Sequence, residues 1–551
     1  MKITRISVWS VVYLVAFSIL LLFMVYPLSS VIKASFLNTE GTAVSLEAYA
    51  KLIANEQYRD TILNSIFLGL LAAAGALTIG VPMAYVVARC DVPGKSYIKA
   101  LGSLPIVFPS FAIGWAWIVL LGRNGLVTVW FRNLGIESPP IYGWHGVAFV
   151  FIFTLFPVIF LMVSGALNSI DASLEEAARN LGSSDFRVFY TVTLPLITPS
   201  IVGSALLVFI LAIENFGVPI ILGERFSVLS VEAYLQFMSE LGGNPATAGA
   251  MSMILVTIAT ITLLIQRYYV ARKEYGMSLI RLPETKILGR VGKILAIGYC
   301  GLVILISLIP LLVIAVASFA KARGPVLHPE FSLANYAKAL TNLRPILNSY
   351  FLSTVATIVC VLISVFVAYV LVRRRSLLNP LLDTLFMFPY AIAGVILGIG
   401  LIVAFNRPPL ILTGTWIILV VSYFVRKSPA TLRSASSILY QIDTSIEEAS
   451  INLGVSPLQT FFKITLRLMA PALIPGAILT WVTIMGELSS TIVLYYGPWA
   501  TMTIQILQEI LSADFGPACA LSVILVLSVL IPVMIVNKIS APTVEQATVS
   551  Q

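Results

Sequence analysis

The sequence predicts an all-α integral membrane protein with about twelve transmembrane helices in two parallel six-helix repeats. Of its 551 residues, 59% are hydrophobic and only 11% are charged, whereas a soluble protein carries roughly 25% charged residues. Most of the chain divides into apolar stretches of the ~20 residues that a membrane-spanning helix needs. A polar segment between such stretches occurs twice, which indicates that the helices belong to two repeats.

Six spans are expected in each half of the chain. The first apolar stretch is too long for the core of a signal peptide and lacks a small-residue cleavage site, so we expect it to be retained. The tenth span is the weakest, because Arg426 and Lys427 end its apolar stretch. The expected spans are residues 8–31, 62–88, 98–121, 145–167, 197–222, 246–270, 294–319, 346–372, 381–405, 411–425, 469–495 and 516–536.

The basic residues predict that the N-terminus lies in the cytoplasm. With that orientation about two thirds of the 34 Lys and Arg residues fall on the cytoplasmic side, as expected when positively charged loops stay inside. Membrane topology therefore accounts for the net charge of +9, and we expect no nucleic acid as a partner. Six spans separate the two copies of the polar segment, so both copies are expected on the cytoplasmic side.

The repeated segment covers residues 170–199 and 442–471. Half of the 30 aligned positions are identical, at a spacing of 272 residues. The tripeptide Leu-Asn-Ser also recurs, at 63–65 and 347–349, with a spacing of 284. The spacing changes across an outer loop, where chains tolerate insertions. We therefore expect a first half at 1–265, a basic cytoplasmic linker at 266–293 and a second half at 294–551.

Each copy of the segment is expected to form a short helix, a glycine turn and a second amphipathic helix. Ser173 precedes Glu176 at the spacing of a capping box, and Glu175 adds negative charge at the positive helix end. Gly182 stands where a helix terminates, and Pro195 and Pro199 are expected to end the second helix. The second copy repeats this pattern with Ser445, Glu447, Glu448, Gly454 and Pro471.

The two segments resemble the EAA loop of binding-protein-dependent ABC importer permeases. The motif is Glu-Ala-Ala, a glycine six residues after the glutamate, and an apolar stretch ending in Leu-Pro. The second copy departs from it twice, with Ser450 for the second alanine and Arg467 for the proline. The matching residues are Glu176, Ala177, Ala178, Gly182, Leu194 and Pro195 in the first copy and Glu448, Ala449, Gly454 and Leu466 in the second.

The resemblance implies a multi-pass permease subunit of a bacterial inner membrane. Two separate ATPase subunits would dock on the EAA loops, and a periplasmic or lipid-anchored substrate-binding protein would dock outside. The partner subunits would use the ATP, so no cofactor and no enzymatic activity are expected in this chain. The nearest candidate for a phosphate-binding loop, residues 93–96, has Arg89 where the motif needs its first glycine. The competing interpretation of each loop is an amphipathic segment that lies on the membrane or on its own bundle.

The fusion of both halves in one chain resembles the ferric iron group of these permeases, whose relatives carry thiamine, aminoethylphosphonate and polyamines. The segments 214–219 and 486–491 resemble the same group. Glu214 and Glu487 are the carboxylates predicted deep inside spans, where charges are costly and face a bundle interior or a water-filled path. With Asn215 they are candidates for the translocation path and for favouring a cationic cargo. The alternative is a packing role for these side chains.

Two further classes of protein compete with the importer permease. A proton-coupled secondary transporter would use Glu214 and Glu487 as proton carriers, but a carrier that works alone has no use for two docking loops. An enzyme would need a catalytic cluster, and the sequence suggests none. No metal site is expected, because the two histidines, His145 and His328, have no partner at ligand spacing.

Overall fold

The computed structural model describes residues 8–38, 43–137, 140–239, 244–272, 285–323 and 326–540. Within these ranges, nine helices are long and apolar enough to cross a membrane, or eleven if each of two bent helix pairs is one span. The one sheet in the described ranges is an antiparallel pair of short strands. The predicted all-α membrane fold is confirmed.

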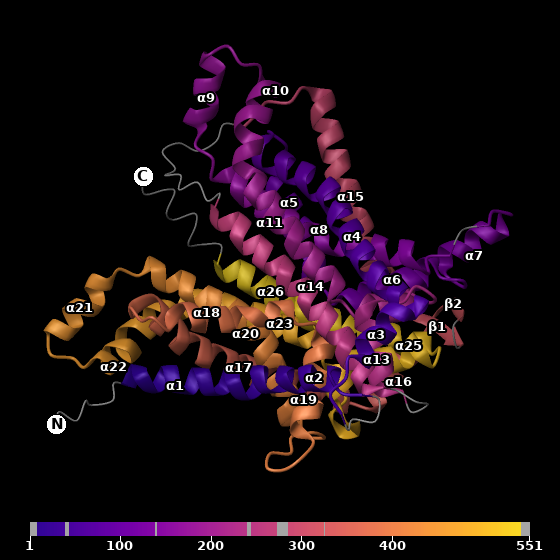
Figure 1. The fold of residues 1–551 in the computed structure, drawn as a ribbon. Coiled ribbons are helices and arrows are strands. Elements are labelled where there is room, and N and C mark those ends of the chain that lie inside the picture. The colour runs from indigo at the N-terminus through magenta and orange to yellow at the C-terminus, as the bar shows by residue number, and fades with distance from the viewer. Residues whose placement is uncertain are drawn as a thin grey trace. The chain divides into compact units, whose positions relative to one another are not determined.

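The chain forms two compact units, which are described separately. The first unit is Val44–Ser332 and contains the first EAA loop, residues 170–199. Its long helices α4, α8 and α11 pack on one another (Figure 1). The elements of the first unit are α3 Glu47–Ala54, α4 Glu56–Arg89, α5 Lys95–Ser103, η2 Leu104–Ile106, α6 Ser110–Leu121, α7 Leu126–Asn133, α8 Trp144–Asn168, α9 Ala172–Asn180, α10 Asp185–Val188, η3 Phe189–Thr193, α11 Leu194–Ile213, α12 Gly217–Leu222, α13 Leu229–Met238, α14 Pro245–Arg272, α15 Arg290–Ala317, β1 Ala320–Arg323 and β2 Val326–Phe331.

The second unit joins Met1–Leu37 with Leu333–Gln551 and contains the second EAA loop, residues 442–471. Helices α17, α20 and α23 pack on one another as their counterparts do in the first unit. The elements of the second unit are α1 Val8–Leu20, η1 Leu21–Val25, α2 Tyr26–Ser35, α16 Ala334–Thr341, α17 Arg344–Arg373, α18 Asn379–Met387, η4 Phe388–Ala391, α19 Gly394–Phe405, α20 Trp416–Gln441, α21 Thr444–Asn452, α22 Pro457–Thr460, η5 Phe461–Thr465, α23 Leu466–Met485, α24 Thr491–Leu494, η6 Gly497–Trp499, α25 Met502–Leu511 and α26 Phe515–Ser540.

The two units exchange their first helices. The N-terminal helices α1 and α2 pack against α17 and α19 of the second unit, whereas α15, which follows the linker, packs against α4, α5, α6 and α8 of the first unit. Each unit therefore combines most of one sequence repeat with the first span of the other. The predicted boundaries at 265 and 294 divide the sequence repeats and not the compact units. They remain a prediction.

Small residues allow the central helices to approach closely. A Cβ atom added at Gly80 of α4 would lie 2.9 Å from Cβ of Ile159 and 3.0 Å from the carbonyl oxygen of Phe156, both in α8. Helices in a membrane gain stability chiefly from such close packing, because lipid is as apolar as their side chains.

The repeated Leu-Asn-Ser tripeptides fasten equivalent loops in the two units. Asn64 Nδ2 donates to the carbonyl oxygen of Ser227 at 3.1 Å, and Ser65 Oγ accepts from the backbone N–H of Leu229 at 2.8 Å. In the second unit, Asn348 donates to the carbonyl oxygens of Pro498 and Ala500, and Ser349 accepts from the N–H of Met502. In each unit, the Asn and Ser side chains of the tripeptide thus form hydrogen bonds with backbone groups next to or at the start of one helix, α13 in the first unit and α25 in the second.

Several predicted span boundaries were wrong. Helix α20 runs through Arg426 and Lys427 to Gln441, because Arg426 pairs with buried Glu487 inside the unit at 2.5 Å and does not mark a membrane edge. Every 18-residue stretch of α20 contains three cations, so this helix is not among the eleven apolar candidates. The predicted third and ninth spans are each broken, the ninth by a 108° bend between Asn379–Tyr390 and Gly394–Phe405.

Candidate functional site

Each EAA loop begins with a short helix that an aspartate caps. Asp171 Oδ1 accepts a hydrogen bond from the N–H of Ser173 at 2.9 Å, and α9 starts at Ala172. Asp443 caps α21 in the same way through Ser445 N–H at 2.9 Å. The predicted capping boxes that begin at Ser173 and Ser445 were wrong. Aspartate is as good an N-cap as serine, and here it starts each helix earlier.

A glycine ends each of these helices, as the sequence predicts. Gly182 and Gly454 both have φ of +85°, a left-handed conformation that costs other L-residues free energy. The N–H groups of Gly182 and Ser183 donate to Arg179 O and Ala178 O at 2.8 and 3.1 Å, which is the Schellman pattern. A Cβ atom at either glycine would meet nothing within 4 Å. The backbone conformation of the turn, and not packing within this chain, therefore favours glycine.

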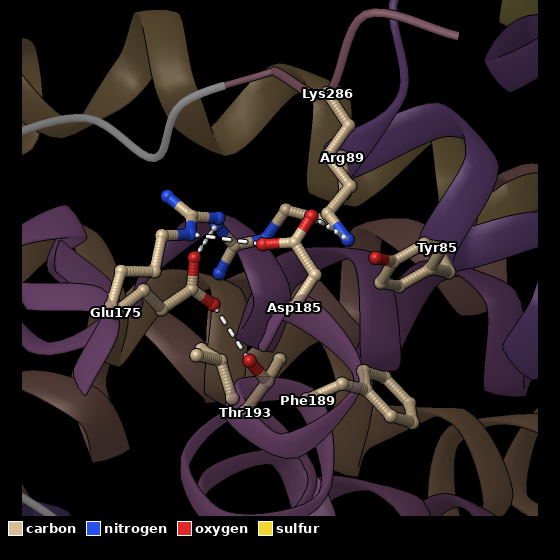
Figure 2. Close-up of a pocket in the computed structure, with 9 residues that line it drawn as sticks. Tyr85, Arg89, Glu175, Asp185, Phe189, Thr193 and Lys286 are labelled. Atoms are coloured by element: carbon tan, nitrogen blue, oxygen red, sulfur yellow. Dashed lines mark hydrogen bonds and ion pairs between the residues drawn. The ribbon is translucent and has the colours of Figure 1, made fainter. Parts of the chain in front are cut away.

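In the first EAA loop, Glu175 is buried and anchors α9 to the end of α4 (Figure 2). Its carboxylate accepts from Arg89 Nη1 at 3.1 Å and from Thr193 Oγ1 at 2.7 Å. Arg89 is only 4% exposed, and its Nε and Nη2 have no hydrogen-bond partner among the described residues. The prediction that Glu175 mainly adds charge at the helix end misses this tertiary ion pair.

The second EAA loop has an equivalent anchor with a different hydrogen-bond pattern. Glu447 accepts from Arg373 Nε at 3.2 Å and from the hydroxyl of Tyr369 at 3.0 Å. Arg373 Nη2 also donates to the carbonyl oxygen of Ile442 at 2.6 Å. The guanidinium of Arg373 thus binds both the carboxylate of α21 and the chain that enters this helix. In the first unit, Tyr85 is the counterpart of Tyr369 by the 284-residue spacing, and it faces Lys286 instead (Figure 2).

The sequence contains a signal for both anchors. Arg89 and Arg373 lie 284 residues apart, the spacing of the Leu-Asn-Ser repeats, and Glu175 and Glu447 lie 272 residues apart, the spacing of the loops. A charged residue that recurs at the repeat spacing on a span end, together with an opposite charge that recurs on the adjacent loop, is a candidate ion pair.

The departure at Ser450 is matched by a second change in the same loop. Ser450 is buried, and its hydroxyl hydrogen-bonds Thr460 Oγ1 at 2.9 Å. In the first loop the counterparts of these residues are Ala178 and buried Val188. Two apolar residues in one loop thus stand where the other loop has a hydroxyl pair, and both loops keep the same helical arrangement.

The departure at Arg467 leaves the backbone unchanged. In both loops a π-helical turn, η3 or η5, leads directly into the following long helix at Leu194 or Leu466. Pro195 follows Leu194 in the first loop and Arg467 takes its place in the second, so the proline does not cause the π turn. The prediction that Pro195 and Pro199 end a helix was wrong, because η3 continues directly into α11, whose first turn contains Pro195 and whose interior contains Pro199. Pro471 lies inside α23, next to a 65° bend.

The tips of both loops expose apolar side chains. Leu181 is 88% exposed and its counterpart Leu453 is 85% exposed. Ala177, Ala449 and Glu448 of the motif are exposed as well, and Glu176 is partly exposed. In Figure 1, α9 and α21 project beyond the long helices of their own units. The recurrence of an exposed leucine at equivalent positions makes the two tips candidates for a contact surface.

The structure places the three predicted pathway residues in equivalent segments after α11 and after α23. Asn215 Oδ1 accepts from Val218 N–H at 3.1 Å and Glu487 Oε1 accepts from Ser490 N–H at 3.2 Å. The carbonyl oxygens of Asn215 and Glu487 accept from Ser230 and Thr503. Asn215 is therefore the structural counterpart of Glu487, and Glu214 is the residue before it, at the C-cap of α11.

Glu487 is buried between two cations. Its oxygens lie 2.5 Å from Arg426 Nη1 and 3.0 Å from Lys427 Nζ, both on α20. The first unit has Thr154 and Leu155 at the positions of these two cations. The charge cluster of the second unit thus carries a net charge of one positive, and the same position in the first unit is neutral. No group of three or more His, Cys, Asp and Glu side chains in the described ranges is arranged to hold a metal ion.

Two like loops, each anchored to a long apolar helix and each exposing a leucine at its tip, define a class of protein, the membrane permeases of ABC importers. The sequence matches the family model for the binding-protein-dependent transport system inner membrane component over residues 6–275 and 360–546. The chain belongs to this family. It is a multi-pass permease subunit of an ABC importer of the inner membrane.

Known permeases are similar to this chain over one half or over both. The ferric transport system permease protein FbpB of Actinobacillus pleuropneumoniae is 27% identical over 92% of this chain and 74% of its own length. The probable ABC transporter permease protein y4fN of Sinorhizobium fredii is 28% identical over 93% of this chain and 92% of its own length. The molybdenum transport system permease protein ModB of Escherichia coli K12 is 29% identical over 41% of this chain and all of its own length.

Proposed function

We propose that this permease moves ferric iron, delivered by an external substrate-binding protein, across the inner membrane. Two separate ATPase subunits dock on the two EAA loops and supply the energy from ATP. The N-terminus and both loops lie in the cytoplasm. The chain itself holds no nucleotide and contributes the path and the docking surfaces.

The architecture that the two EAA loops share supports ATPase docking. Each loop is held rigidly at its base by a buried arginine–glutamate pair and exposes an apolar tip. A rigid helix can transmit the closure of an ATPase dimer to the spans, because it moves together with the helix end to which it is tied. The contact residues proposed are Glu176, Ala177, Ala178 and Gly182 in the first loop and Glu448, Ala449 and Gly454 in the second, with Leu181 and Leu453 added from their exposure.

Similarity to ferric transport permeases over about nine tenths of the chain supports iron as the cargo. A permease of 2-aminoethylphosphonate is a second candidate for the cargo class, because the permease protein PhnV of Salmonella paratyphi A is 29% identical over 43% of the chain. Thiamine and polyamines remain alternatives from the sequence analysis. The family membership argues against a secondary transporter.

The charges near Glu487 refine the proposed path. Glu214, Asn215 and Glu487 remain the proposed path residues, but Arg426 and Lys427 offset the charge of Glu487. This cluster therefore does not favour a free cation. We assign the choice of cargo to the external binding protein, which releases its ligand into the permease.

The test is uptake of radiolabelled ferric iron into vesicles that contain this chain, its ATPase and its binding protein. We expect ATP-dependent uptake that Gly182→Asp with Gly454→Asp abolishes, because each aspartate puts a negative charge at the negative end of a docking helix. The matched control is Gly135→Asp with Gly414→Asp. These glycines also have positive φ, of +76° and +83°, and also have nothing within 4 Å of an added Cβ.

The possible outcomes separate the parts of the proposal. Loss of uptake in the loop variant alone supports docking on the EAA loops and iron as cargo. Loop-dependent ATP hydrolysis without iron uptake overturns the cargo and retains the importer. Uptake that needs no ATP, or equal loss in the control variant, overturns docking on the loops.

A further inference from the structure

The end of the linker between the two repeats is fixed to the end of α4 in the first unit. The N–H of Lys286 donates to the carbonyl oxygen of Arg89 at 2.7 Å, and the N–H of Asp91 donates to the carbonyl oxygen of Lys286 at 2.9 Å. Lys293 Nζ, on the first turn of α15, lies 2.7 Å from Asp91 Oδ2. These contacts hold the backbone of Lys286 beside the base of the first EAA loop.

From this position the side chain of Lys286 reaches the loop itself. Its Nζ lies 3.2 Å from Asp185 Oδ2 at the start of α10, while Arg179 Nε of α9 lies 3.1 Å from Asp185 Oδ1 (Figure 2). Partial burial acts to lower the pKa of Lys286, but the carboxylate of Asp185 and the hydroxyl of Tyr85 together outweigh it, so that this pKa is raised above its ordinary value. Asp185 therefore joins the linker to both helices of the first EAA loop.

The second EAA loop cannot make this contact. The counterparts of Arg179 and Asp185 are Ile451 and Pro457, which carry no charge. In the second unit, the exchanged first helix α1 contributes an aromatic side chain instead. Trp9 of α1 is 5% exposed, stacks on Tyr369 with ring centroids 4.3 Å apart, and meets the edge of Phe461 at 5.7 Å. Phe461 begins the π turn of the second EAA loop.

We propose that Lys286 is a positioning residue for the first EAA loop, acting through Asp185, and that Trp9 positions the second EAA loop through Tyr369 and Phe461. The exchanged first helix of each unit thus supports the coupling loop of that unit. The first support is a partly exposed ion pair, and the second is mainly aromatic packing, with the Arg374 guanidinium 5.7 Å from the centroid of the Trp9 ring. Salt is therefore expected to affect the first loop more than the second. The consequence for transport rests on the proposed function, but the positioning itself does not.

The test measures the mobility of each loop by electron paramagnetic resonance of a spin label on Leu181→Cys or Leu453→Cys. These two positions are equivalent and exposed, and the four native cysteines are buried. The full chain is labelled in lipid nanodiscs without ATPase subunits. We expect Lys286→Ala to remove the immobile component of the spectrum at position 181 and to leave position 453 unchanged. Trp9→Ala should have the reverse effect.

Two further measurements exclude a general loss of folding. Lys286→Arg should keep the immobile component, whereas Asp185→Asn should remove it as Lys286→Ala does, because both variants break the ion pair between the linker and α10. Raising the salt concentration to about 1 M, where the screening length is about 3 Å, should mobilise the label at 181 in the otherwise unaltered chain and not the label at 453. A label at 181 that ignores both Lys286→Ala and salt overturns the proposal, and so do equal changes at the two labels. Because no ATPase is present, these results are independent of docking.

Discussion

The two arginines that anchor the EAA loops differ in how fully they are hydrogen-bonded. Arg89 uses Nη1, while Nε and Nη2 have no partner in the described part of the chain. Arg373 uses Nε and Nη2 for two different acceptors. A buried donor without a partner costs free energy, whereas a bond to a charged group contributes about 1.5–3 kcal/mol. The same substitution should therefore have different effects at the two sites.

We expect Arg373→Lys to destabilise the protein by about 2 kcal/mol, because a single ammonium cannot replace a guanidinium that binds two acceptors in different directions. Arg89→Lys should cost much less, since lysine keeps one ion pair and removes two unpaired donors. The measurement is the apparent melting temperature of the purified full chain. The control is Arg123→Lys at the exposed pair with Glu224, where little change is expected. Equal losses for Arg89→Lys and Arg373→Lys would contradict this argument.

At the residue scale, the sequence predicted backbone roles better than side-chain partners. Gly182 and Gly454 were identified because a left-handed helix end depends on local sequence. The partners of Glu175 and Glu447 were not, because an ion pair between a loop and a distant span end depends on tertiary packing. The choice of Asp171 over Ser173 as the cap was ambiguous locally, since both residue types are good N-caps.

At the scale of elements, the segments after α11 and α23 share one backbone arrangement but differ in their charged side chains. Glu487, Arg426 and Lys427 in the second unit replace Asn215, Thr154 and Leu155 of the first. Removing one partner from a buried charge cluster typically costs about 3–5 kcal/mol, whereas replacing the whole cluster with neutral residues is often harmless. The first unit supplies a neutral set that this backbone accepts.

We therefore expect Glu487→Gln to lower the apparent melting temperature strongly, because it leaves two partly buried cations without their carboxylate. The triple variant Glu487→Asn, Arg426→Thr and Lys427→Leu should recover most of that loss. Asn215→Asp is the matched control in the first unit, where a new, partly buried carboxylate would have Thr154 and Leu155 in place of the two cations and should be destabilising. If the triple variant is no more stable than Glu487→Gln, the cluster has a structural role that the neutral set cannot replace.

Elements were predictable where the apolar pattern alone decides them. The spans at α4, α8 and α17 follow from continuous apolar sequence. Helix α20 does not, because its Arg426 pairs with a carboxylate 61 positions away in the chain. The prolines misled the prediction in both loops. Pro199 and Pro471 were expected to end helices, yet the helices continue through them, as membrane helices often do when neighbouring groups satisfy the freed carbonyl.

At the scale of the whole molecule, the exchanged first helices make each compact unit depend on both sequence repeats. The sequence predicted two repeats from their internal similarity, but apolar periodicity does not say which repeat a lipid-exposed helix packs against. The first unit needs α15 from the second repeat, and the second unit needs α1 and α2 from the first. Neither repeat alone contains all the helices of a unit.

This dependence predicts how a divided chain behaves. If the chain is split within residues 273–284, we expect each fragment to be degraded or aggregated when expressed alone. The co-expressed fragments should co-purify in equal amounts, because each fragment supplies helices to the unit that the other fragment mostly forms. The measurement is the recovery and stoichiometry of the untagged fragment on a tag carried by its partner. Removing residues 1–37 from the first fragment is the control. It takes α1 and α2 from the second unit and should lower recovery, with only α15 still joining the second fragment to the first unit. Either fragment alone as a monodisperse, protease-resistant protein would show that the exchanged helices are dispensable for folding of the units.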